Sequence, residues 1–260
     1  MFILTTSVLI SFILSFKRRM EVNYAQSPIL ATSFIITVLY LNSIYTSLNF
    51  GYFILLILGI ISVIDNIIFV KYYRFKLRNN EVNSFLCFLL LVLFLSLVSL
   101  FVELGRWDEF SHWGTHAKYI FLNSALYDSS IDIVHKSYPV GSALFYFIFL
   151  KYSTFSESVL YFAQSLLLLL PLACFIYPKN EAYQKVIFKL FVLIVILTIF
   201  GVRIGPTGNL YMDHIVAIYF GCCLVYYVNS KKTFKEIILI IFILVLFLQF
   251  KDSLLDQDKK

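Results

Sequence analysis

The stretch YFILLILGIISVIDNIIFV, residues 52–70, is a nearly unbroken apolar run. Its length is close to the roughly 20 residues that an α-helix needs to cross the hydrocarbon core of a bilayer. Similar runs lie on both sides of it, separated by short polar stretches. They cover residues 2–16, 28–47, 84–103, 158–177, 186–202, 211–229 and 236–250. A shorter apolar run occupies residues 140–150.

The composition agrees with a chain built from such segments. Hydrophobic residues make up 60% of the sequence, aromatic residues 18%, and the mean hydropathy is +0.86. Apolar crossings must be helical, because lipid offers the backbone no hydrogen-bond partner. We therefore predict an all-α, polytopic transmembrane protein with about 8 spans and a short juxtamembrane helix at 140–150. We expect the four cysteines to be small buried hydrophobes: Cys87, Cys174, Cys222 and Cys223.

The distribution of Lys and Arg predicts the orientation of these helices. The net charge is +6, but the basic residues flank the apolar runs, which indicates membrane topology and no nucleic-acid partner. Residues 17–19 and the loop at 71–78 are strongly basic, so both are expected in the cytoplasm. The 104–138 loop is then outside. If 140–150 does not cross, the basic cluster at 231–235 is also inside, and residues 203–213 emerge on the same side as the 104–138 loop.

This arrangement predicts one membrane domain over residues 1–260. Four N-terminal helices occupy 1–103, an extracytoplasmic, catalytic-type loop occupies 104–157, and four further helices occupy 158–250. A polar tail follows at 251–260. The first helix is expected to be retained, because its positive charges follow the apolar run, whereas those of a signal peptide precede it.

The 104–138 loop holds the densest set of ionisable and aromatic side chains in the chain. They are Arg106, Trp107, Asp108, Glu109, His112, Trp113, His116 and Lys118. If this segment is helical, Asp108, His112 and Thr115 share a face, with His116 beside them. An aromatic belt with solvated charges at the membrane interface is the simpler explanation. Zinc binding by Asp108, His112 and His116 is a further alternative.

Two other stretches carry candidate functional residues. SYPVGSALFYFIFL, residues 137–150, places Tyr138 and Pro139 before the short apolar helix. GPTGNLYMDHIVAIYF, residues 205–220, places Asp213 and His214 at the outer end of an apolar helix. An ionisable residue at membrane depth is a functional hypothesis, and its alternative is a helix-end side chain that reaches water.

Together, the three stretches resemble the GT-C superfamily of polyprenyl-phosphate-sugar glycosyltransferases, which includes protein O-mannosyltransferases and the aminoarabinose transferases of lipid A. The family has an acidic pair at the start of its first large outer loop, matched here by Asp108 and Glu109. Residues 138–141 look like a variant of its Pro-Pro-containing surface helix, and Asp213 fits a later acidic residue. The resemblance covers roughly residues 104–220.

The resemblance implies transfer of a sugar, with inversion, from an undecaprenyl- or dolichyl-phosphate carrier to an acceptor hydroxyl or amine. The acceptor would be an envelope glycan, lipid or protein, and the enzyme would lie in the inner membrane of a bacterium with its site outside. Asp108 is the first choice for the general base and Glu109 the second, while Asp213 would orient the acceptor or help to hold a cation. A need for a divalent cation is left open.

The resemblance also implies roles for the neighbouring side chains. Four cations are expected to stabilise the lipid-phosphate leaving group: Arg106, Lys118, Lys136 and Arg203. His112 and His116 would donate to phosphate or bind a divalent cation, and the loop's aromatic residues would stack on sugar or line the path of the lipid. Tyr138, Pro139 and His214 complete the expected substrate-binding set.

Three alternatives remain open at the level of sequence. A polysaccharide polymerase or ligase would act on the same lipid-linked glycans. A transporter or flippase would carry out no covalent chemistry, although transporters tend to place ionisable residues near the bilayer midplane in two corresponding halves. An inactive, truncated relative is the third.

Overall fold

The computed structural model describes residues 2–20, 22, 24, 26–73, 80–127, 131, 140–176, 189, 210 and 212–229. Helices are its only regular secondary structure over these residues. The longer helices are α1 (Phe2–Arg19), α2 (Ser27–Tyr45), α3 (Leu48–Tyr73), α4 (Asn80–Val98), α7 (Glu157–Leu169) and α10 (Met212–Asn229). The shorter ones are α5 (Gly114–Asn123), α6 (Gly141–Leu150) and α8 (Ala173–Ile176). Two 3-10 turns, η1 (Ser99–Phe101) and η3 (Leu170–Leu172), and a π-helical turn, η2 (Glu109–Trp113), connect some of them.

The apolar runs correctly predicted where these helices lie, except for α5, which lies within the predicted 104–138 loop. The observed helix ends fall within a few residues of most of the expected ones; for example, α3 covers the run at 52–70 and α6 covers 140–150. The runs at 186–202 and 236–250, and the tail at 251–260, lie outside the described residues apart from Lys189. The all-α prediction is therefore confirmed for the described part of the chain.

Three described helices are long and apolar enough to cross a membrane. They are Ser27–Tyr45, Leu48–Phe69 and the continuous stretch Glu157–Phe175. Residues 85–101 and 213–225 are shorter apolar helices, and α1 carries serines and threonines that lower its hydropathy. Large apolar side chains are exposed along α3, α4 and α10, as expected of helices that face lipid. The predicted count of about 8 spans remains a prediction.

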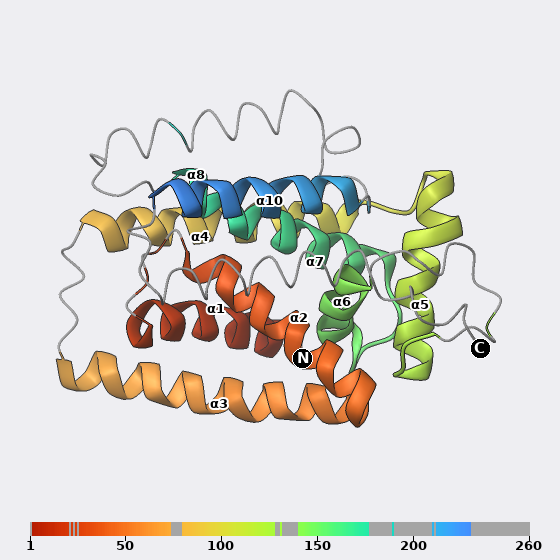
Figure 1. The fold of residues 1–260 in the computed structure, drawn as a ribbon, viewed down its shortest axis with the longest axis horizontal. Helices are drawn as coiled ribbons and strands as arrows, with labels where there is room; N and C mark the ends of the chain where they lie inside the picture. The colour runs from red at the N-terminus through yellow and green to blue at the C-terminus, as the bar shows by residue number, and fades with distance from the viewer. Residues whose placement is uncertain are drawn as a thin grey trace.

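Most of the long helices run along the length of the molecule, and α5 lies across one end (Figure 1). We call this end, where α4 and η1 finish and α7 begins, the α5 end. The C-terminal ends of α1 and α3 lie at the opposite end, which is also the end where α4 begins (Figure 1). Lys17, Arg18, Arg19 and Lys71 belong to these C-terminal turns. The described basic helix ends and the acidic loop therefore lie at opposite ends of the bundle.

Helix α6 is buried at every one of its 10 residues. It packs against α2, α5 and α7, and Tyr146 donates a hydrogen bond to Gln164 of α7. At 1.5 Å per residue it is about 15 Å long, which is about half the thickness of the hydrocarbon core. Its length agrees with a helix that does not cross. Protein encloses it on all sides, and its expected juxtamembrane position stays a prediction.

Buried polar pairs also join the long helices. Thr32 of α2 and Tyr219 of α10 are hydrogen-bonded at 2.7 Å. Cys222 of α10 donates to the Pro171 carbonyl at 3.1 Å. Cys174, Cys222 and Cys223 are buried as predicted, whereas Cys87 is exposed on α4. The expectation of burial was wrong for Cys87, because the apolar run does not reveal which side of a helix faces its neighbours.

Candidate functional site

The chain leaves helical geometry after η1, and carboxylates bind the backbone there. The peptide N–H of Leu104 donates to Oε2 of Glu157, the first residue of α7, at 3.1 Å. The next two N–H groups, those of Gly105 and Arg106, both donate to Oε2 of Glu109 at 3.1 Å. Three successive backbone donors are thus satisfied by two acidic side chains, which fixes the path of residues 104–106.

Glu109 also bonds to a distant part of the chain. Its second carboxylate oxygen, Oε1, accepts from the peptide N–H of Leu210 at 3.1 Å. Leu210 comes just before α10, so this bond holds the start of α10 at the α5 end. Leu210 therefore lies next to the 104–138 loop, which agrees with the expectation that residues 203–213 emerge on the same side as that loop. The Glu109 side chain is only 1% exposed, which argues against its expected second role as a general base.

Glu109 begins a π-helical turn that continues to Trp113. The N–H of Gly114 bonds to the Glu109 carbonyl, five residues earlier. A Cβ at position 114 would lie 2.6 Å from that carbonyl oxygen and 3.2 Å from Leu104 Cδ1. Glycine therefore allows the wide turn to close against the 104–106 segment. Single π-turns of this kind interrupt the 3.6-residue period.

The wide turn changes which side chains face outward. Asp108 is half-buried, His112 is buried and Thr115 is exposed, and the π-turn interrupts the regular helix that their predicted common face assumes. Trp107, beside Asp108, is 80% exposed. Asp108 is consequently the accessible member of the acidic pair, and Glu109 is the enclosed member.

His112 and His116 point into the protein. His116 Nδ1 and the Tyr127 hydroxyl are 3.4 Å apart, and their rings are 4.8 Å apart. Burial raises the pKa of Tyr127. Trp113 approaches the edge of the His116 ring. These contacts anchor α5 to the residues that follow it, and they give His116 a packing role beside the expected one in substrate binding.

Two lysines lie against aromatic rings near α5 and α6. Lys118 is exposed, and its Nζ lies 5.7 Å from the centre of the Phe155 ring. Lys151, at the end of α6, donates to Ser124 Oγ at 2.8 Å and lies over Phe147. Desolvation lowers the pKa of Lys151. Lys118 was a predicted site residue and Lys151 was not. The signal that could have identified Lys151 is its position directly after the short apolar run.

Asp213 and His214 occupy the first turn of α10, near Leu210. Asp213 is exposed and His214 is half-buried. Arg106, whose own N–H group donates to Glu109, is half-buried. The remaining expected residues lie outside the described residues: Lys136, Tyr138, Pro139 and Arg203.

The described residues give no support to the zinc hypothesis. They contain no group of three or more His, Cys, Asp or Glu side chains that could hold a metal ion. Asp108 and the two histidines differ in exposure, and His116 contacts Tyr127. Chemically, the described α5 end offers accessible carboxylates and cations.

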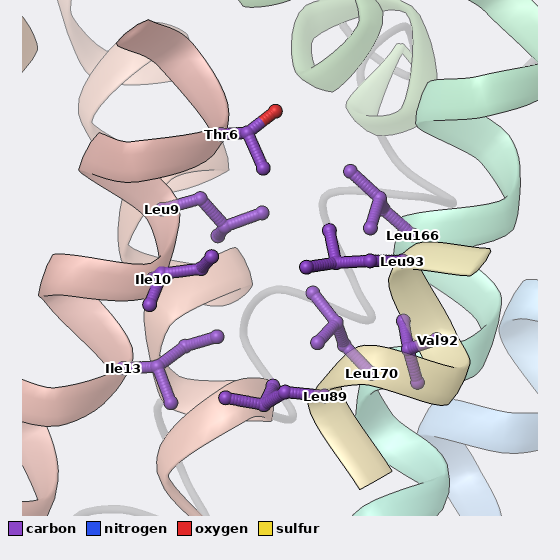
Figure 2. Close-up of a pocket in the computed structure, with 9 residues that line it drawn as sticks. All are labelled: Thr6, Leu9, Ile10, Ile13, Leu89, Val92, Leu93, Leu166 and Leu170. Carbon is purple, nitrogen blue, oxygen red and sulfur yellow. The ribbon is translucent and has the colours of Figure 1, made fainter. Parts of the chain in front are cut away.

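Two small apolar cavities lie inside the bundle. The one in Figure 2, between α1, α4 and α7, is about 10 Å³ and is lined by aliphatic side chains and Thr6. The other is about 20 Å³ and is lined by residues of α1, α2, α3 and α6. Each is of the order of one water molecule in size, and both are apolar, so they are gaps in the packing and unsuitable for a sugar or lipid. The lining residues do not include any of the predicted site.

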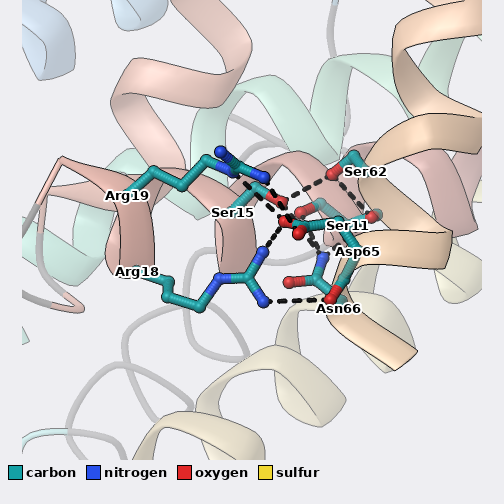
Figure 3. A network of polar contacts seen from close by, with 7 residues as sticks. All are labelled: Ser11, Ser15, Arg18, Arg19, Ser62, Asp65 and Asn66. Atoms are coloured by element: carbon teal, nitrogen blue, oxygen red, sulfur yellow. Dashed lines mark hydrogen bonds and ion pairs between the residues drawn. The ribbon is translucent and has the colours of Figure 1, made fainter. Parts of the chain in front are cut away.

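A polar cluster joins α1 and α3 (Figure 3). Asn66 donates to Ser11 Oγ at 3.0 Å and to Ser15 Oγ at 3.2 Å, and Ser62 bonds to the same two serines at 2.8 and 2.7 Å. Next to it, Asp65 pairs with both Arg18 and Arg19. We call these seven residues the α1–α3 cluster.

The two arginines of the α1–α3 cluster were expected only to indicate topology, and no role was predicted for Asp65. The available signal was an acidic residue followed by an amide within the apolar run at 52–70. Two members of the cluster, Arg18 and Arg19, belong to the last turn of α1, which lies at the opposite end of the bundle from α5 (Figure 1). Because its side chains bond to one another across α1 and α3, the cluster holds these two helices together.

No protein-family model matches this chain, and no curated protein or solved structure is significantly similar to it.

Proposed function

We propose that this chain is a multi-pass membrane glycosyltransferase of the GT-C type, which moves a sugar from a polyprenyl-phosphate carrier to an acceptor hydroxyl or amine. The observation that carries the proposal is the bond between Glu109 and Leu210. It joins the two acidic stretches of the predicted motif at one end of the bundle, although they are 101 residues apart. Asp108 and Asp213, the acids beside that bond, both retain solvent exposure.

The basic residues support one orientation of the chain in the membrane. The described basic turns of α1 and α3 lie opposite the α5 end, which under the positive-inside tendency supports an α5 end outside the cytoplasm. Donor sugars carried on polyprenyl phosphate would be used on that face. We propose a bacterial inner membrane, about 8 crossings, and an acceptor that belongs to the envelope, such as a glycan, a lipopolysaccharide or a protein.

In the proposed reaction, Asp108 is the general base. It removes the proton of the acceptor hydroxyl or amine while the acceptor oxygen or nitrogen attacks the anomeric carbon of the donor sugar. The bond between that carbon and the phosphate oxygen breaks, and the electron pair leaves with the lipid phosphate. Attack from the face opposite the leaving group inverts the anomeric centre.

Cations at the α5 end would stabilise the developing phosphate charge. Lys118 is exposed, Arg106 is half-buried, and Lys151 lies at the end of α6. Such contacts are strong where water is excluded. Asp213, in the first turn of α10, would orient the acceptor or hold a divalent cation.

The test is glycan profiling of the cell envelope in a deletion strain that carries wild-type or variant chain. Asp108→Asn keeps nearly the same shape but removes the base, so it should abolish one glycan product while expression and membrane insertion remain normal. The matched control is Glu103→Gln, which changes an exposed carboxylate of the same segment and should restore the product. An unchanged profile in the deletion strain itself would favour a transporter or an inactive relative instead.

The orientation has a separate test in a cysteine-free background. A cysteine in place of exposed Lys118 should react with an impermeant thiol reagent added to intact cells, and one in place of exposed Lys71 should not. The reverse labelling pattern would refute the extracytoplasmic site.

A further inference from the structure

The two adjacent acids of the predicted motif have different surroundings. The Glu109 carboxylate is enclosed and accepts from three backbone N–H groups, each at 3.1 Å. Asp108 is half-buried and lies next to the exposed Trp107. A general base needs free access to the proton that it removes, within about 2.6–3.2 Å. Only Asp108 meets that condition here.

We propose that Glu109 is a positioning residue whose carboxylate holds the start of α10, with Asp213 and His214, against the segment that carries Asp108. The part of this proposal that concerns catalysis rests on the proposed function. Its structural part, that this carboxylate joins residues 105–106 to residue 210, stands independently.

The partners of the carboxylate explain why a charged group occupies a buried position. Gly105 and Arg106 follow a helix end, and Leu210 precedes a helix start, so their N–H groups lack partners within a helix. A carboxylate has two oxygens and only accepts hydrogen bonds, which suits three converging donors. A change of side chain does not remove the backbone N–H group of a residue. The contact is thus insensitive to the identity of residues 105, 106 and 210 unless one of them becomes proline.

Neighbouring contacts brace the same connection. Glu157 of α7 binds the N–H of Leu104, and the Tyr161 hydroxyl donates to the Glu103 carbonyl at 3.3 Å. The π-turn closes through Gly114, where a side chain would collide with the Glu109 carbonyl. Residues 103–106 are therefore fixed to α7, and Glu109 extends that fixed segment to α10.

Glu109→Gln is the informative variant. It preserves shape but replaces one acceptor oxygen with an NH2 donor, so either the Leu210 N–H or the pair from Gly105 and Arg106 must face another donor. Glu109→Asp is the conservative control, because it keeps both oxygens on a side chain shorter by one methylene. Asp108→Asn is the positional control, because it changes the neighbouring acid without touching the three N–H groups.

The first measurement is amide hydrogen exchange on the purified full chain in detergent. Peptides that contain residues 104–106 and residue 210 should exchange about tenfold faster or more in Glu109→Gln. The exchange should return partway toward the wild-type rate in Glu109→Asp and stay at that rate in Asp108→Asn. Wild-type exchange in Glu109→Gln would overturn the proposal, whether or not the chain is a glycosyltransferase.

The second measurement is the pH profile of transfer, which a purely structural change does not move. If Asp108 is the base, Glu109→Gln should lower kcat and keep the acidic limb of the profile at the same pH. Loss of that acidic limb in Glu109→Gln would make Glu109 the base and overturn its assignment as a positioning residue. Absence of any transfer by the wild type would refute the proposed function and leave the exchange result to decide the structural part.

Discussion

Asp65 pairs with two arginines of α1, and we predict that the two pairs contribute unequally to stability. The Arg18 side chain is 18% exposed and that of Arg19 is 66% exposed, while that of Asp65 is 28% exposed. Arg18 also donates to the Asp65 carbonyl at 3.1 Å and lies over the Phe69 ring. Arg19 makes its contacts from the solvent-exposed side. The protein therefore screens the Arg18 pair from solvent much more than the Arg19 pair.

Burial sets the expected size of each coupling energy. An exposed pair contributes about 0.2–1 kcal/mol, and we assign this range to Arg19. Breaking a fully buried pair costs about 3–5 kcal/mol, so the partly buried Arg18 pair should show a coupling of about 1–3 kcal/mol. Higher salt should reduce the Arg19 coupling first, because exposed charges are screened more strongly.

Two double-mutant cycles measure these couplings, one with Arg18→Gln and Asp65→Asn, the other with Arg19→Gln and Asp65→Asn. The assay is unfolding of the purified chain in mixed micelles, followed by the fluorescence of Trp107 and Trp113. Each cycle isolates the pair from the other contacts of the same arginine. Equal couplings, or a larger coupling for Arg19, would refute the argument from burial.

Two further predictions concern the α5 end. Gly114→Ala should destabilise the chain by about 1–3 kcal/mol, because its Cβ meets the Glu109 carbonyl, whereas Gly105→Ala, with its nearest atom 3.9 Å away, should leave the unfolding midpoint nearly unchanged. Equal midpoints for the two variants would contradict the tight π-turn. Tyr127 has a pKa raised above 10.0, so the folded state keeps its proton at a pH where the unfolded state loses it. Its contribution to stability should fall above about pH 10, by up to ~1.4 kcal/mol per pH unit, and a melt series should show a shallower alkaline decline in Tyr127→Phe.

Hydrophobic run length was sufficient to locate the described helices other than α5, because the apolar runs differ sharply from the polar stretches between them. It could not show which sides of the helices pack together. The sequence showed that α6 is only about half as long as a membrane crossing. Its burial could not be predicted, because it depends on packing against helices such as α2, which is distant in sequence. Asp65 was a visible acidic residue in an apolar run, yet its partners come from α1.

In the candidate site, too, the position along the chain was predictable and the contacts were not. The stretch around Asp108 and Glu109 was identifiable as a charged segment between apolar runs. The different surroundings of the two acids were not predictable, because Glu109 is enclosed by a contact with Leu210 and by a π-turn that breaks the helical period. The expected face of Asp108, His112 and Thr115 assumed a regular helix. The π-turn adds one residue to the turn, so the assumed spacing does not hold there.

The enclosure of α6 constrains how the chain is assembled during synthesis. Its surroundings include α2, made before it, and α7, made after it. At about 15 Å it is too short to cross a membrane by itself, and the part of its apolar surface that contacts α7 stays uncovered until α7 emerges from the ribosome. Residues 141–150 are therefore expected to reach their final position only together with α7. A pause in translation between these helices would leave the aromatic surface of α6 open to chaperones or to wrong partners.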